Sequence, residues 1–290
     1  MHYFSFMVKK SKKSTHAPPA VAGHTKSTQI AGESIKGTDD AGRFYNSHDA
    51  LATEQSLHKD EFYEANRLYW NHGGCSGSND DEAMTGDEGA IADGIEGLAF
   101  LDRFLSKHKG EPIHRFDHAV DLGAGAGRVT KLVLLKRYSE VRLVEGDEGW
   151  SKRSRGYLGR KRASRCSFSN QLLYDITEKD VIEWGEPVDL MWVQWTLQYL
   201  IDEDFVNCLR ILSGGLRMGS GVLIVKENRP YGVAREDRFQ MDVPGTIGGN
   251  ERYDLTRTDS HHRFLFERAG LKVNFMERGE ETNTYALAVV

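Results

Sequence analysis

Short apolar runs alternate with segments of helical spacing through the chain after Leu105. The alternation predicts strands at Ala119–Leu122, Val141–Glu145, Ser167–Leu173, Leu190–Trp195 and Val222–Lys226, with helices at Arg128–Arg137, Trp150–Leu158 and Asp204–Ser213 between them. Apolar strands separated by amphipathic helices are typical of a parallel sheet that helices cover on both faces. The pattern therefore predicts an α/β, Rossmann-like fold around a mostly parallel sheet.

The C-terminal residues break this alternation. After a last helix at His261–Ala269, two strands are predicted at Leu271–Glu277 and Thr284–Val290, and a polar, turn-like segment joins them. Two strands joined by a short turn form an antiparallel hairpin. A seven-stranded sheet that ends in such a hairpin is typical of class I methyltransferases, whereas a plain dinucleotide-binding dehydrogenase domain usually lacks the hairpin.

The N-terminal third is divided by composition. Residues 1–49 are expected to form a disordered tail, because the stretch from about Ser14 is rich in Ser, Thr, Gly, Ala and Pro and lacks apolar periodicity. Helical spacing of apolar residues then begins near Leu57 and recurs from Gly94 to Leu105. Residues 50–110 are therefore predicted to form a helical lid, and residues 111–290 the main domain.

Charge and composition narrow the class of protein. Hydrophobic residues make up 39% and charged residues 28%, which is ordinary for a globular protein. No apolar run is long enough to span a bilayer, so we expect no membrane partner. The net charge of -5 argues against a general affinity for nucleic acid. The 3 scattered cysteines are typical of reduced thiols, so a cytoplasmic or nuclear location is expected.

The strongest local signal is a glycine-rich segment between a predicted strand and a predicted helix. It reads Val120-Asp121-Leu122-Gly123-Ala124-Gly125-Ala126-Gly127-Arg128. Glycines allow the backbone to approach a ligand closely, and the start of the following helix presents free N–H groups. Taken alone, such a segment is also compatible with a tight turn that binds nothing.

Two details favour S-adenosylmethionine as the ligand of this segment. Glu145 ends the next strand, where a carboxylate that binds both ribose hydroxyls is expected. The Gly-x-Gly-x-Gly spacing also differs from the Gly-x-Gly-x-x-Gly of nicotinamide enzymes, which direct a helix dipole at a pyrophosphate. S-adenosylmethionine has no pyrophosphate, and Arg128 can pair with its carboxylate. The alternative for Arg128 is an exposed helix arginine.

Two further motifs identify a family. Trp192-Val193-Gln194-Trp195 and Val225-Lys226-Glu227-Asn228, together with the glycine segment, closely resemble the protein alpha-N-terminal methyltransferases. Members of that family methylate the free amino terminus of proteins that begin X-Pro-Lys or X-Pro-Arg. The resemblance runs from about Arg67 to the C-terminus, and it includes Tyr69-Trp70 and Met84-Thr85-Gly86. Both the substrate, a protein or peptide with a free N-terminus, and the cofactor S-adenosylmethionine are implied by this resemblance.

The resemblance also implies roles for individual residues. The methionyl part of the cofactor would be held by Gly123, Gly125 and Arg128, and its amino or carboxylate group would be reached by Gln194. The ribose and adenine would be surrounded by Glu145, Gly146 and Asp147, with Leu173 and Tyr174 beside the adenine. From the lid, the cofactor would be covered by Met84, Thr85 and Gly86. The substrate channel would be walled by Trp195, Tyr69 and Trp70, and Asn228 would hydrogen-bond the substrate terminus. Core packing or turn capping is the alternative role for Trp195, Leu173, Asn228, Tyr69 and Trp70.

The sequence departs from the family pattern in two places. The family places a His, proposed to remove a proton, where this chain has Tyr199, and a tyrosine with a pKa near 10 is a poor base. Tyr199 can still orient the substrate amine. The family's acidic segment after Asn228 is also interrupted by an apparent insertion within Gly232 to Asp259. Candidate acids there are Glu236, Asp237, Asp242, Glu251 and Asp254, of which Asp254 is favoured and Glu251 is second.

Three other functions stay open at this point. A methyltransferase for small molecules would share the glycine segment, although the Trp-x-Gln-Trp motif argues against it. A non-catalytic module could keep the fold and the ligand. A nicotinamide-dependent oxidoreductase is disfavoured by the glycine spacing and by the terminal hairpin.

Overall fold

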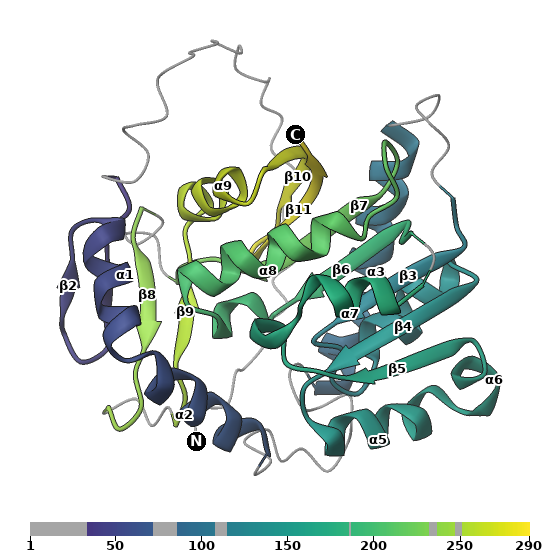
Figure 1. Cartoon of the computed structure of the whole chain (residues 1–290), viewed down its shortest axis with the longest axis horizontal. Coiled ribbons are helices and arrows are strands. Elements are labelled where there is room, and N and C mark those ends of the chain that lie inside the picture. Colours follow the sequence, from purple (N-terminus) through teal and green to yellow (C-terminus); the bar gives the residue numbers. More distant parts are fainter. Residues whose placement is uncertain (1–33, 72–85, 108–114, 186, 232–236, 247–250) are drawn as a thin grey trace, which may run out of the picture.

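The computed structural model of the chain describes residues 34–71, 86–107, 115–185, 187–231, 237–246 and 251–290. Met84, Thr85 and Glu236, as well as most of the predicted tail, lie outside these ranges. The described part is built around a seven-stranded sheet with the strand order β10-β11-β7-β6-β3-β4-β5. A second, four-stranded sheet with the order β2-β1-β8-β9 stands beside it (Figure 1).

The large sheet confirms the predicted fold class. Its strands are β3 (His118–Leu122), β4 (Glu140–Glu145), β5 (Cys166–Asn170), β6 (Leu190–Gln194), β7 (Val222–Asn228), β10 (Leu271–Arg278) and β11 (Thr282–Val289). The first five run parallel, and β11 is inserted antiparallel between β7 and β10. The C-terminal hairpin therefore closes one edge of a parallel sheet, as the sequence predicts.

Helices cover both faces of this sheet. One face carries α7 (Glu178–Glu183), α8 (Asp202–Gly214) and α9 (Asp259–Arg268), and the other carries α3 (Gly86–Lys107), α4 (Arg128–Leu132) and α5 (Glu148–Leu158). Alternate strand residues feed the two cores: Met191 and Val193 pack with the first group, whereas Leu190 and Trp192 pack with the second. This two-residue alternation follows from the pleat of a strand. The two layers of helices explain why β6, in the middle of the sheet, is buried at every residue.

Some predicted boundaries differ from the structure. The predicted helix Arg128–Arg137 is divided into α4 and a 3-10 turn at Leu134–Lys136. The predicted strand Ser167–Leu173 ends at Asn170, and Leu173 begins the 3-10 turn η3 (Leu173–Asp175). A further helix, α6 (Arg160–Ala163), precedes β5. These differences matter for the site, because η3 turns Leu173 and Tyr174 toward the carboxyl end of the sheet.

The small sheet was not predicted from the sequence. Its strands are β1 (Gly37–Asp39), β2 (Phe44–Tyr45), β8 (Phe239–Asp242) and β9 (Asp254–Thr256), and β1 pairs in parallel with β8. Ile35, Leu51, Phe239 and Leu255 form its buried core. The prediction of a disordered tail up to residue 49 is therefore wrong for residues 34–49, which form β1, β2 and the start of α1 (His48–Leu57).

The helices upstream of β3 do not form one separate lid. Helix α2 (Lys59–Asn71) lies over the carboxyl end of the sheet. Helix α3 instead packs on one face of the sheet, where its Phe100 and Leu101 are buried in the core. The predicted boundary at residue 110 therefore separates α3 from the sheet on which it packs. No helix in the described ranges is both long enough and apolar enough to cross a membrane.

Candidate active site

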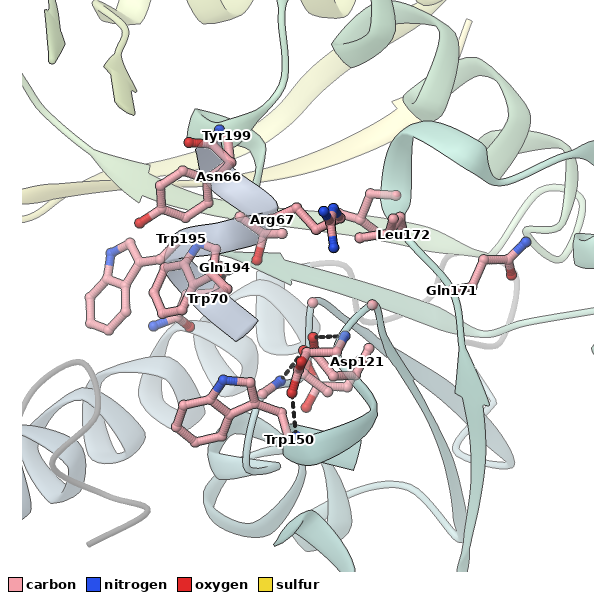
Figure 2. Close-up of a pocket in the computed structure, with 18 of the residues that line it drawn as sticks. Asn66, Arg67, Trp70, Asp121, Trp150, Gln171, Leu172, Gln194, Trp195 and Tyr199 are labelled. Carbon is pink, nitrogen blue, oxygen red and sulfur yellow. Dashed lines mark hydrogen bonds between the residues drawn. The ribbon is translucent and has the colours of Figure 1, made fainter. Parts of the chain in front are cut away.

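A cavity opens where β3, β4 and β6 end, and residues of α2 line its outer side (Figure 2). Ligands bind at this edge of open α/β sheets, because the loops that follow the strands converge there. The cavity is lined by every predicted cofactor residue from Gly123 onward, namely Gly123, Gly125, Arg128, Glu145, Gly146, Asp147, Leu173, Tyr174 and Gln194. Trp70, Trp195 and Tyr199 also line it, so the structure brings part of the predicted substrate wall to the same cavity as the cofactor residues.

Four predicted site residues are not part of the cavity lining: Tyr69, Asn228, Asp254 and Gly86. Tyr69 contacts Trp70, with 5.1 Å between the ring centres, so it supports the lining from behind. Asn228 and Asp254 belong to β7 and β9 and reach the cavity through their neighbours. Gly86 is the first residue of α3, and its predicted cofactor contact stays a prediction.

The glycine segment forms the floor of the cavity. Gly123 has a φ of 66°, and a Cβ atom there would lie 2.3 Å from the hydroxyl oxygen of Thr196, so only glycine fits. Below the segment, the Asp121 carboxylate accepts hydrogen bonds from the backbone N–H of Thr130, at 2.9 Å, and from its hydroxyl, at 2.6 Å. This pair fixes the first turn of α4 against β3. The floor is therefore held in place by contacts within the protein.

The Glu145 side chain fixes the glycine segment to the loop that follows β4. One carboxylate oxygen accepts the N–H of Gly125 at 2.7 Å, and the other accepts the N–H of Asp147 at 2.9 Å. Burial raises the pKa of Glu145, and the two backbone hydrogen bonds oppose that shift. Each oxygen keeps a second lone pair for a ligand hydroxyl. The arrangement is compatible with the predicted diol contact and adds a structural role that the sequence did not indicate.

Asp93 of α3 is the centre of a buried ionic network. Arg128 forms an ion pair with one oxygen of Asp93, and Lys226 binds the other at 2.8 Å. Lys226, which is fully buried, also binds Glu96 at 2.6 Å. Burial raises the pKa of Asp93, but the charges of Arg128 and Lys226 outweigh it and hold the pKa below its ordinary value. The network fixes the Arg128 guanidinium at the cavity wall.

Gln194 joins the same network. Its carbonyl oxygen accepts the indole N–H of Trp192 at 3.0 Å, and its amide nitrogen donates to both carboxylate oxygens of Asp93 at 2.9 and 3.0 Å. The amide orientation is fixed, since the indole can only donate. The predicted contact of Gln194 with the methionyl end of the cofactor stays a prediction. It requires the Gln194 amide to bind the cofactor in addition to Trp192 and Asp93.

Trp195 turns into the cavity on a strained backbone. Its φ is 53°, in the left-handed region, which costs an ordinary residue roughly 1–2 kcal/mol. The Arg128 guanidinium lies 4.9 Å from the centre of its ring. Trp70 contacts Tyr199, with 5.4 Å between ring centres, so three aromatic side chains line the same part of the cavity (Figure 2). Strain retained at such a position is typical of functional sites.

Tyr199 is positioned by the 3-10 turn η4 (Leu197–Tyr199), which is held at its start and its end. The Glu227 carboxylate accepts the N–H groups of Thr196 and Leu197, at 3.0 and 2.8 Å. Arg257 donates to the carbonyl oxygen of Leu197, at 3.0 Å, and also to that of Leu200. Neither Glu227 nor Arg257 was assigned a role from the sequence, because only the fold brings them to the turn.

A hydrogen-bonded chain joins Asn228 to Tyr199. The amide nitrogen of Asn228 donates to Gln198 at 3.1 Å, and the amide nitrogen of Gln198 donates to the Tyr199 hydroxyl at 2.9 Å. Burial, and after it the charge of Asp254, raises the pKa of Tyr199 well above its ordinary value. Tyr199 therefore stays protonated, and its predicted role in orienting the substrate amine stays a prediction. Gln198 was assigned no role from the sequence.

Asp254 lies beside an arginine. The Arg252 guanidinium lies 3.4 Å from the Asp254 carboxylate and also stacks over the rings of Tyr69 and Tyr199, at 4.5 and 5.7 Å from their centres. Burial raises the pKa of Asp254 to about 7, although Arg252 opposes the shift. The alternative acid Glu251 is exposed, and Asp237 lies against Lys36, 4.0 Å away. Of these three acids, Asp254 alone is buried near Tyr199.

Comparison with known proteins adds the family. A family profile described as AdoMet-dependent proline di-methyltransferase matches residues 58–289. The chain belongs to this family. As a proline di-methyltransferase family member, it is an enzyme that uses S-adenosylmethionine as its cofactor.

Individual relatives agree with this assignment. The Alpha N-terminal protein methyltransferase 1 of Arabidopsis thaliana is 27% identical over 246 residues, which cover 82% of each chain. The N-terminal Xaa-Pro-Lys N-methyltransferase 1 of Danio rerio is 31% identical over 199 residues, or 68% of this chain and 80% of the relative. A solved S-adenosylmethionine-dependent methyltransferase of Leishmania major has the same fold, with a TM-score of 0.67, 24% identity, and coverage of 91% of this chain and all of that one.

The cavity suits the family's cofactor. Arg128 offers a cation to a carboxylate, and the second lone pairs of Glu145 suit a pair of hydroxyls. The lining also includes Trp150, Leu172 and Leu173, which are suited to a flat base. Asp93, Lys226 and Gln198 escaped prediction because they are polar residues on regular elements whose partners come from distant segments.

Proposed function

We propose that this enzyme transfers methyl groups from S-adenosylmethionine to the alpha-amino group of protein N-termini that begin X-Pro-Lys or X-Pro-Arg. The observation that carries the proposal is the aromatic wall of Trp70, Trp195 and Tyr199 in the same cavity as the cofactor residues. A narrow aromatic wall admits a chain terminus, and its ring faces attract a methylated ammonium by roughly 0.5–2 kcal/mol. The names of the curated relatives support the same substrate class.

Positioning supplies most of the chemistry. The bound cofactor supplies an electrophilic methyl group, so the protein must present a neutral amine in line with it. Alignment of two reactants can contribute about 7–11 kcal/mol. Asn228 lies beyond the residues that line the cavity, and its amide nitrogen is engaged by Gln198, so its carbonyl oxygen is the atom left for an N–H of an amine that extends past the cavity wall. Trp195, held beside Arg128, limits the directions from which that amine can approach.

Proton removal falls to Asp254 or to water. The amino terminus of a peptide has a pKa of about 7.7–8.0, so part of the substrate is neutral near pH 7. The pKa of Asp254 is raised to about 7, which places it close to that of the amine, as an efficient base requires. Tyr199 cannot serve as the base, because its pKa is raised well above the ordinary value.

Mass spectrometry of short peptides tests the proposal. Ser-Pro-Lys-led peptides with a free or an acetylated terminus are incubated with the enzyme and S-adenosylmethionine. We expect methylation of the free form alone. If neither form is methylated while S-adenosylhomocysteine still binds, the proposed substrate is wrong and a small-molecule acceptor is indicated. Methylation of the acetylated form would place the reaction on a lysine side chain.

A further inference from the structure

Three buried polar atoms without a hydrogen-bond partner gather where α2 meets β9. They are Nδ2 of Asn66, Nε of Arg252 and Oδ1 of Asp254, none of which is paired within the described residues. The backbone N–H of Tyr253, between Arg252 and Asp254, donates to Oδ1 of Asn66 at 2.8 Å and so joins the two elements. A buried donor left unpaired costs roughly 1–3 kcal/mol. Such a group at a cavity wall indicates a ligand.

Asn66 is the member of this group that lines the cavity. Tyr63, Asn66, Arg67 and Trp70 are spaced three and four residues apart, so α2 presents all of them to the cavity on one face. Asn66 is 5% exposed. Its amide cannot be reversed, because a reversed amide would set Nδ2 against the N–H of Tyr253. Both N–H hydrogens of Asn66 are therefore left without an acceptor in the described part of the chain, on a residue that lines the cavity.

The position of Asn66 favours a peptide partner over the cofactor. In Figure 2, Asn66 lies on the same side of the cavity as Trp70 and Tyr199, whereas Gln171 and Leu172 lie on the opposite side. Trp70 follows Asn66 by one helical turn and contacts Tyr199. A chain terminus that passes these rings carries main-chain carbonyl oxygens, the acceptors that a buried amide N–H requires.

We propose that Asn66 donates a hydrogen bond from Nδ2 to a main-chain carbonyl oxygen within the first residues of the peptide substrate. The inference rests on the proposed function and adds a recognition residue to the same site. Because the acceptor is a main-chain carbonyl oxygen, this hydrogen bond does not depend on which side chains the substrate peptide carries. It also gives the α2–β9 junction a binding role in addition to its structural one.

Two variants separate binding from structure. Asn66→Ala removes both the donor and the Tyr253 contact. Asn66→Asp, assayed at pH 8.5, keeps an acceptor for the N–H of Tyr253 and replaces the donor by a negatively charged carboxylate oxygen. If Asn66 binds the peptide, both variants raise the peptide KM, by roughly 3- to 10-fold for one neutral hydrogen bond. Affinity for S-adenosylhomocysteine stays within about twofold in both, as in the control Asn207→Ala on the exposed face of α8.

Modified peptides locate the partner atom. In Ser-Pro-Lys-led peptides, each of the first peptide bonds is replaced in turn by an alkene, which removes one carbonyl. One replacement should raise KM for the wild-type enzyme and have no further effect in Asn66→Ala, as expected for groups in contact. The inference is overturned if Asn66→Asp behaves as wild type, if every replacement adds to Asn66→Ala, or if cofactor affinity falls instead. If the wild-type enzyme methylates no peptide, the proposed function fails and this inference fails with it.

Discussion

The two halves of the cavity differ in how their polar groups are paired. Around the glycine segment, Glu145, Asp121 and Gln194 all have partners within the protein, and the charges of Asp93 and Arg128 are matched. Around the junction of α2 and β9, Asn66 and Asp254 each keep a buried polar atom without a partner in the described part of the chain. The named polar groups of the cofactor half are therefore paired within the protein, whereas the α2–β9 half keeps polar atoms that can pair with a ligand.

This difference corresponds to what each half has to bind. A cofactor of fixed structure is best met by groups that are already held in place, because little ordering is then lost on binding. A peptide terminus brings its own donors and acceptors, and these can satisfy the atoms that the protein leaves open. Four substitutions or measurements test this contrast, beginning with the largest expected effect.

Loss of Asp93 should reach beyond the cofactor half to the fold itself. Asp93→Ala leaves the buried Lys226 and Arg128 without their shared carboxylate, which should lower the free energy of unfolding by roughly 3–5 kcal/mol. Urea denaturation measures this loss. Asp102→Ala, in the same helix, removes an exposed ion pair with Arg137 and should cost less than about 1 kcal/mol. Equal losses would contradict the central role of Asp93.

Loss of Glu145 should act on the cofactor. Glu145→Ala frees the N–H groups of Gly125 and Asp147 and removes the predicted diol contact. Hydrogen bonds to a charged group contribute about 1.5–3 kcal/mol each, so affinity for S-adenosylhomocysteine should fall about 100-fold. Calorimetry measures it, with Glu140→Ala at the exposed start of the same strand as the control. An unaltered affinity would remove the ribose assignment.

Asn228 should affect turnover and leave the cofactor in place. Asn228→Ala removes the group that faces the substrate amine and breaks the link to Gln198. We expect the turnover of Ser-Pro-Lys peptides to fall by about 10-fold or more, with affinity for S-adenosylhomocysteine retained. Asn274→Ala, on the exposed side of β10, should match the wild type. Unchanged turnover in Asn228→Ala would move the substrate site elsewhere.

Asp254 should set the acidic limb of the pH profile. Its raised pKa of about 7 means that the carboxylate is lost as pH falls through 7, and the substrate amine is protonated over a nearby range. The logarithm of kcat/KM should therefore rise with a slope near 2 below pH 7. In Asp254→Asn the slope should fall to about 1, because the amine alone still titrates. An unchanged slope would assign the second proton to another group.

The features of the fold that could be predicted from the sequence are those encoded within a short stretch of residues. Strand and helix periods, the glycine segment and Glu145 are each visible within a short window, so the parallel sheet and the cofactor edge follow from the sequence. The small sheet does not, because its strands have two to four residues and pair across distant segments. The prediction of disorder for residues 34–49 was wrong for the same reason.

The site shows the same limit. Gly123 and Arg128 carry recognisable spacing, whereas Asp93 and Asn66 are single polar residues in helices, indistinguishable in sequence from a solvated face. Their burial depends on which helix packs over which strand. Arg252 could not be predicted from the sequence, because only the fold brings it against Asp254, Tyr69 and Tyr199.

The parallel pairing of β1 with β8 has a consequence for how the chain acquires its structure. Gly37 pairs with Phe239, a separation of about 200 residues, and contacts so distant in sequence form late because the loop between them costs entropy. A ribosome that has completed β1 must therefore synthesise most of the enzyme before that strand finds its neighbour. The hydrogen bonds that join the glycine segment to Glu145 and Asp121 to Thr130 link residues much closer in sequence, so they can form before β1 pairs with β8.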